Sequence, residues 1–143
     1  MDSALYNRDI LRLATTLIAN DRLAVADGSA EVRSPICGSR IQADVKMDGD
    51  QRITALALRA NACALGQASA AILRKNAIGA PVASIAALRE AIAKALTSQN
   101  DMPCLWPELE LLSGARDYPA RHAAILLPYD AVIAAAQKTE AEN

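Results

Sequence analysis

Two cysteines are the residues of this chain best suited to chemistry. Cys37 lies in the stretch SPICGSR (residues 34–40), between two segments that read as β-strands, and Cys63 lies in RANACALG (residues 59–66). A cysteine at such a place is either a small apolar filler or a thiolate that binds metal or attacks another sulfur. The prediction of function therefore depends on whether the fold brings these two thiols together.

Composition limits the classes of protein to which the chain can belong. Its 143 residues carry a formal net charge of −1, so no basic excess favours nucleic acid or an anionic membrane surface. Three cysteines are an odd number, which excludes a framework in which every cysteine of one chain forms a disulfide. No apolar run is long enough to span a membrane, and the first residues do not read as a signal peptide. We expect one domain over residues 1–143 in the reducing cytoplasm.

The middle of the chain predicts a small antiparallel sheet. Residues 30–36 read as a short strand, and residues 40–48 and 52–60 both alternate between apolar and polar side chains. The expected inward faces are Ile41, Ala43, Val45 and Met47 on the first alternating segment, and Ile53, Ala55 and Ala57 on the second. The DGD sequence at residues 48–50 is typical of a tight turn, so the two alternating segments form a hairpin.

Helices are predicted before and after these strands in the sequence. Apolar residues recur at helical spacing in residues 4–20, 65–79, 85–98, 108–113 and 119–137. Gly114 is expected to end the short fourth helix and Pro119 to begin the last one. Residues 138–143 read as a frayed polar tail. This order predicts an α+β domain, in which about three antiparallel strands pack against a layer of helices. Cys63 would then stand at a strand-to-helix junction, where the positive end of the helix favours a thiolate.

The sequence resembles a known family in the order and spacing of its motifs. The stretches SPICGSRIQADVKMDGD, ANACALGQASAAIL and SGARDYPARHAAILLPYDAV are similar to the U-type iron–sulfur cluster assembly scaffolds, which include IscU, SufU and the amino-terminal domain of NifU. The resemblance covers nearly the whole chain, and the long segment after Gly79 is more similar to the SufU branch. It implies the same α+β fold, with a transient iron–sulfur cluster or zinc held by three cysteines and an aspartate.

Only two of the four ligand positions of that family carry a ligand here. The first and second cysteines fall on Cys37 and Cys63, whereas the aspartate falls on Ser39 and the third cysteine on Ala124. A serine hydroxyl is a poorer ligand than a carboxylate, and alanine offers no ligand atom. The resemblance therefore implies a divergent member of the family.

Two other residues are candidates to replace the missing ligands. Cys104 lies in the loop before the short fourth helix and is one candidate. His122 stands two residues before Ala124, which on a helix is about 200° of rotation and directs it away from the Ala124 face. A ligand from a second subunit or a partner is a further alternative. Pro128 cannot donate a hydrogen bond to the carbonyl of Ala124, so the last helix is expected to kink there.

The sequence thus predicts a carrier rather than an enzyme. In the first hypothesis the chain is a scaffold-like protein that binds iron or zinc, or accepts sulfur from a cysteine desulfurase, through Cys37 and Cys63. Coordination needs several ligands whereas acceptance of a persulfide sulfur needs one accessible thiolate, so the missing ligands favour sulfur acceptance. In the second hypothesis the chain is a paralogue without metal that regulates the assembly proteins. The expected partners are a cysteine desulfurase and other iron–sulfur assembly proteins.

Overall fold

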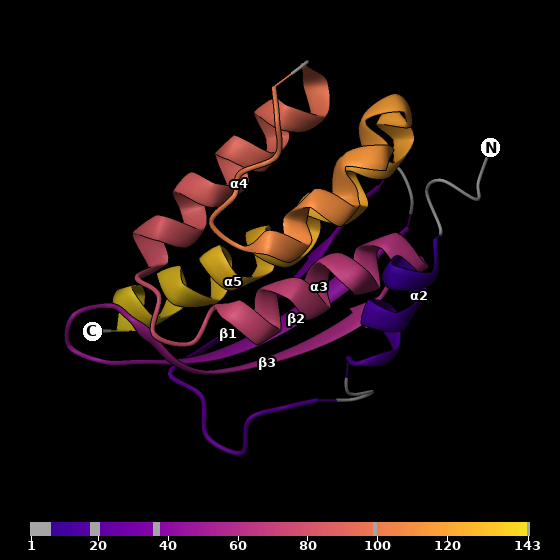
Figure 1. The fold of residues 1–143 in the computed structure, drawn as a ribbon. Helices are drawn as coiled ribbons and strands as arrows, with labels where there is room; N and C mark the ends of the chain where they lie inside the picture. Colours follow the sequence, from indigo (N-terminus) through magenta and orange to yellow (C-terminus); the bar gives the residue numbers. More distant parts are fainter. Residues whose placement is uncertain (1–6, 18–20, 36–37, 99, 143) are drawn as a thin grey trace.

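The fold is built from a three-stranded sheet and a set of helices that cover one of its faces (Figure 1). The computed structural model describes residues 7–17, 21–35, 38–98 and 100–142. In chain order the elements are α2 (Arg8–Thr15), β1 (Gly28–Arg33), β2 (Arg40–Met47), β3 (Ile53–Asn61), α3 (Ala64–Asn76), α4 (Val82–Thr97), the 3₁₀ helices η1 (Pro107–Asp117) and η2 (Pro119–Arg121), and α5 (His122–Glu142). The predicted α+β class is confirmed.

The sheet has the strand order β1–β2–β3, and both pairings are antiparallel. The turn between β2 and β3 is closed by Asp48, whose Oδ1 accepts hydrogen bonds from the backbone N–H groups of Asp50 and Arg52. Gln51 adopts a φ of 59° in this turn. The hairpin predicted from the DGD sequence is therefore present.

One face assignment on β3 was wrong. Ile41, Ala43 and Val45 of β2 face the helices and are fully buried, as expected. A register shift beside Lys46 and Met47 inserts an extra residue into β3, so that Ile53 pairs with Met47 whereas Ala55 pairs with Lys46. An extra residue reverses the alternation of side chains. After the bulge, Leu56 and Leu58 rather than Ala55 and Ala57 therefore share the helix-facing side with Ile53.

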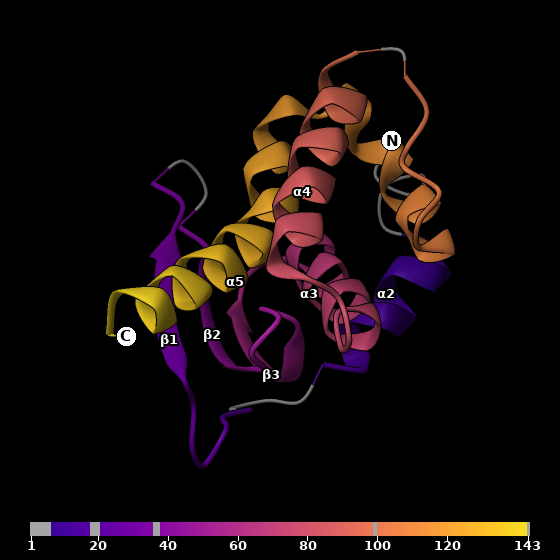
Figure 2. The ribbon, with the colours of Figure 1, turned by 90° about the vertical axis from the view of Figure 1, so that its left-hand side faces the viewer.

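Two helices lie directly on the sheet, and the others pack on them. In Figure 2, α5 crosses over β1 and β2 while α3 lies over β3. The helix α2 packs against α3, and α4 packs against α5. Gly28 at the start of β1 allows α5 to come close, because a Cβ there would stand 2.1 Å from the carbonyl oxygen of Ala135.

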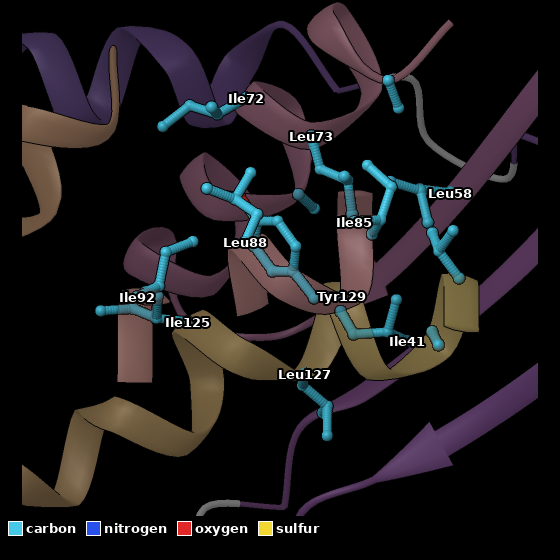
Figure 3. Packing of buried hydrophobic residues seen from close by; sticks show 14 of the residues in the cluster. Ile41, Leu58, Ile72, Leu73, Ile85, Leu88, Ile92, Ile125, Leu127 and Tyr129 are labelled. Atoms are coloured by element: carbon cyan, nitrogen blue, oxygen red, sulfur yellow. The ribbon is translucent and has the colours of Figure 1, made fainter. Parts of the chain in front are cut away.

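The core lies between the sheet and this helical layer (Figure 3). Its largest fully buried side chains include Ile41, Leu58, Ile72, Leu73 and Tyr129. Removing apolar side chains of this size from water is the main stabilising contribution to a fold, at roughly 2 kcal/mol for each. Alanine supplies many of the remaining contacts, which lets α3 and α5 pack closely.

The helices after α4 differ from the expected boundaries. The helix at residues 108–113 is a longer 3₁₀ helix, η1, which continues through Gly114 to Asp117. Its buried residues Leu109, Leu112 and Ala115 recur every three positions, as three residues per turn require. The last helix continues beyond Gln137 to Glu142, so the expected frayed tail is helical over most of its length. Within the described residues, no helix is long and apolar enough to cross a membrane.

Residues 21–27, which lead into β1, lie against the outer face of the sheet and cover Asp44. The Asp44 side chain is 1% exposed. It accepts hydrogen bonds from Arg22 Nε at 2.6 Å, the Leu23 N–H at 3.1 Å and Ser29 Oγ at 2.6 Å. Burial opposes ionisation of Asp44, but the hydrogen bonds from Arg22, Ser29 and Leu23 and the charge of Arg22 outweigh it, so the pKa is lowered. We call residues 21–27 the strap.

Candidate functional site

Cys63 occupies the N-cap of α3, directly after β3. Its backbone is extended, with φ −64° and ψ 168°, and its side chain is neither buried nor fully exposed. A helix N-terminus presents unpaired N–H groups and a partial positive charge, both of which stabilise a nearby anion. The first turn of α3 has no acidic residue that would oppose such an anion. The predicted strand-to-helix junction is confirmed, and its thiol is accessible in part.

The turn that carries the other candidate residues lies at the same end of the sheet. Arg40 at the start of β2 pairs with Asn61 at the end of β3, two residues before Cys63. Ser39 precedes Arg40 and is 4% exposed, and its carbonyl accepts the N–H of Ser34 at 2.9 Å. Cys37 lies outside the described residues. Its approach to Cys63 therefore stays a prediction.

Ala124 is buried beside the first turn of α3. It is 1% exposed, and a Cβ built on Gly66 would stand 3.4 Å from the Cβ of Ala124 and 3.3 Å from its carbonyl oxygen. The position that resembles the third cysteine of the family thus packs against Gly66, three residues after Cys63. The methyl group of Ala124 occupies this position. The close approach of α5 to α3 here depends on the absence of a side chain at Gly66.

The segment of α5 around Pro128 remains helical. The helix is unbroken from His122 to Glu142, with Pro128 inside it. Proline leaves the carbonyl of Ala124 without its usual donor. At the next carbonyl, that of Ile125, Ser69 Oγ of α3 donates a hydrogen bond of 2.7 Å. Pro128 therefore does not interrupt the helix, and α3 packs against α5 over this segment. The expected kink stays a prediction.

The proposed replacement ligands lie in different surroundings. Cys104 is exposed, next to the 62% exposed Leu105, in the connection between α4 and η1. The ring Nε2 of His122, at the start of α5, lies 2.8 Å from the carbonyl oxygen of Ala115 in η1. This contact joins the two neighbouring helices. Among the described residues, no group of three or more His, Cys, Asp or Glu side chains is placed to hold a metal ion.

These residues do not fit a cluster held by four ligands of this chain. Cys63 offers a sulfur atom, Ser39 a hydroxyl oxygen and Ala124 no ligand atom at all. Structural zinc and iron–sulfur centres take four donors, mostly thiolate or imidazole. What the arrangement does provide is a partly accessible sulfur at a positive helix end.

Two features of this region were missed from the sequence. Gly66 was read only as part of a helix, although a glycine in a helix interior costs about 1 kcal/mol and so signals a close contact. Arg33 and Arg40 were not singled out, although they stand directly opposite one another on β1 and β2. Their opposition follows from the strand register, which the sequence did not specify.

Comparison with known proteins places the chain in a family. The profile of the NifU-like N-terminal domain matches residues 14–124. The crystal structure of a nitrogen-fixing NifU-like protein (N-terminal) from Brucella abortus is 34% identical, with a TM-score of 0.91, and the match covers 99% of this chain and 98% of that one.

A second solved structure shares the fold at lower identity. It is a protein proposed as an iron–sulfur cluster assembly scaffold for the SUF system of Fervidobacterium islandicum AW-1. It is 19% identical, with a TM-score of 0.83, over 95% of this chain and 99% of that one. Among the curated proteins, none matches the chain significantly.

Proposed function

Because the chain belongs to the NifU-like N-terminal domain family of iron–sulfur assembly scaffolds, we propose that it serves this assembly by accepting sulfur at Cys63 from a cysteine desulfurase. The observation that carries the proposal is the contrast between Cys63 and Ala124. The chain keeps a partly accessible thiol at the N-cap of α3, while a buried methyl group fills the neighbouring ligand position.

The proposed step is an exchange between a thiolate and a persulfide. The Cys63 thiolate attacks the terminal sulfur of the persulfide on the desulfurase cysteine, and a new sulfur–sulfur bond forms at Cys63. The bond between the terminal sulfur and the desulfurase cysteine breaks, and that cysteine leaves as a thiolate. The proton on the terminal sulfur travels with it, so the step needs no added oxidant or reductant.

Local structure supports this chemistry. Cys63 stands at the N-cap of α3, a helix of 13 residues whose N-terminal end carries a partial positive charge. Partial exposure allows a second protein to approach the thiol. Cys37 is proposed as a second acceptor, and iron or zinc binding by the two thiols would require further ligands from a partner.

Mass spectrometry of the thiols tests the proposal. Purified chain is incubated with a cysteine desulfurase and cysteine, alkylated, digested and examined for peptides that have gained one sulfur atom. We expect the added sulfur on the Cys63 peptide and its loss in Cys63→Ser. Cys104→Ser is the matched control, because Cys104 is more exposed but has no such helix end, and it should leave transfer unchanged. Sulfur on Cys104 alone would contradict the proposal.

A second function is favoured by the same lost ligands. A chain that keeps the scaffold surface but has no cluster site could itself act as a regulator, by binding the desulfurase or a complete scaffold. In that case Cys63→Ser and Cys37→Ser would leave desulfurase binding intact, and no sulfur would be found on either thiol. Metal content after anaerobic reconstitution separates both functions from a true scaffold, which would retain zinc or a cluster near one per chain.

A further inference from the structure

Arginines gather on the outer face of the sheet, at the end nearest Cys63. Arg33 of β1 stands opposite Arg40 of β2, and Arg40 in turn pairs with Asn61 of β3. One row further along, Gln42 pairs with Arg59. Arg33 and Arg40 are exposed and Arg59 is partly exposed. We call Arg33, Arg40 and Arg59 the basic end of the sheet.

These charges oppose folding rather than assist it. Like charges placed directly opposite one another on neighbouring strands destabilise a sheet. The side chains of Arg33 and Arg40 alternate onto the same face, away from the helices that cover Ile41 and Ala30. A local arrangement that costs stability without a structural gain is typical of a functional surface.

Among the described residues, the only carboxylate that forms an ion pair with the three arginines of this end is that of Glu31. Arg33 has only the exposed Glu31, at 3.6 Å, and Arg40 has no ion pair among the described residues. Arg59 Nη1 lies 3.3 Å from the side-chain amide of Gln42, which is a neutral partner. The nearby buried carboxylate, Asp44, is engaged by Arg22 of the strap.

We infer that the basic end docks a carboxylate-rich surface of the protein that exchanges sulfur with this chain. Guanidinium groups pair with carboxylates in a bidentate geometry. Arg40, which has no ion pair among the described residues, gives up no internal charge partner on binding. Arg40 pairs with Asn61, two residues before Cys63, so a partner seated here binds at the end of the sheet where Cys63 follows β3. The identity of this partner rests on the proposed function; the acidic character of its surface rests on the arginines.

One substitution pair on a single strand tests the inference. Arg40→Glu places a carboxylate opposite Arg33, so it should hold or raise the stability of the sheet while it reverses the charge offered to the partner. Lys46→Glu is the matched control: Lys46 is exposed on the same face of β2, about 20 Å along the strand. Binding of a cysteine desulfurase is measured by calorimetry at low and at raised salt.

We expect Arg40→Glu to weaken binding about tenfold and to reduce its salt dependence, with Lys46→Glu unchanged. Equal loss in both variants, or none in Arg40→Glu, would overturn the docking surface. If single-stranded DNA binds as tightly as the desulfurase does, and Arg40→Glu releases it, the choice of a protein partner is overturned.

The Cys63→Ser variant separates the docking surface from the sulfur-acceptor function, and it should bind the desulfurase normally. If binding depends on Arg40 but no sulfur reaches Cys63, the sulfur-acceptor function fails while the docking surface stands.

Discussion

The strap over the sheet and the junction between α3 and α5 differ in whether their functional groups are engaged by the rest of the chain. At the strap, a buried carboxylate on Asp44 is fully engaged by Arg22, Ser29 and the Leu23 N–H. At the junction, Cys63 keeps a partly accessible thiol while Ala124 fills a family ligand position with a methyl group. The first arrangement serves stability. The second leaves one sulfur partly accessible beside a buried methyl group.

Restoring the missing ligands should produce the largest change at the junction. The double variant Ser39→Asp and Ala124→Cys supplies the family's donor set, and we expect it to retain about one zinc ion per chain after dialysis, measured by elemental analysis. Ser39→Asp with Ala123→Cys is the matched control, because Ala123 is a less buried neighbour on α5. Equal zinc in both variants, or in the unaltered chain, would contradict our account of Ala124.

Removing the strap carboxylate should be the largest stability effect. Asp44→Ala leaves Ser29 and the Leu23 N–H without their acceptor and Arg22 without its counter-charge. We expect a loss of about 3 kcal/mol in the free energy of unfolding, measured by urea denaturation. Asp50→Ala is the control, since Asp50 is exposed in the hairpin turn, and it should change stability by less than about 0.5 kcal/mol. Sulfur transfer to Cys63 should survive in both.

Acid should weaken the strap selectively. The pKa of Asp44 is lower in the folded chain than its ordinary value of 3.8, so the folded state favours the ionised form. The resulting stabilisation is fully present above the unfolded value and is lost as the pH falls through the folded value. Urea unfolding between neutral pH and pH values below about 4 should therefore show a smaller acid-induced loss in Asp44→Ala than in the unaltered chain. Parallel pH curves would contradict this assignment.

The hydrogen bond between α3 and α5 should have the smallest effect. Ser69→Ala removes the buried bond from Ser69 Oγ to the Ile125 carbonyl, and we expect a cost of about 1 kcal/mol in thermal or urea unfolding. Thr97→Ala removes an exposed hydroxyl-to-carbonyl bond at the end of α4 and should cost less. A larger loss for Thr97→Ala would show that this bond does not hold the junction.

The sequence predicted elements whose signals are local. Alternation along β2 placed Ile41, Ala43 and Val45 on the buried face, and the DGD turn located the hairpin. The same rule failed on β3, because the bulge that reverses its faces depends on pairing with β2 and leaves no local mark. Gly114 was expected to end a helix, but tertiary packing of Leu112 and Ala115 continues η1 past it.

The candidate site was predictable only in outline. Cys63 was placed at its helix start because a strand pattern gives way to a helical one there. The strap over Asp44 and the opposition of Arg33 to Arg40 depend on contacts between segments far apart in sequence, which no single stretch encodes. The burial of Ala124 against Gly66 likewise follows from how α5 crosses α3.

A chain in which Cys63 is the single remaining cysteine gives the most direct test of sulfur acceptance. The double variant Cys37→Ser and Cys104→Ser is incubated with a cysteine desulfurase and cysteine, and its intact mass is then measured. We predict a gain of one sulfur atom that is removed by a reducing thiol. An unchanged mass, with the desulfurase active and bound, would contradict the claim that this thiol receives sulfur.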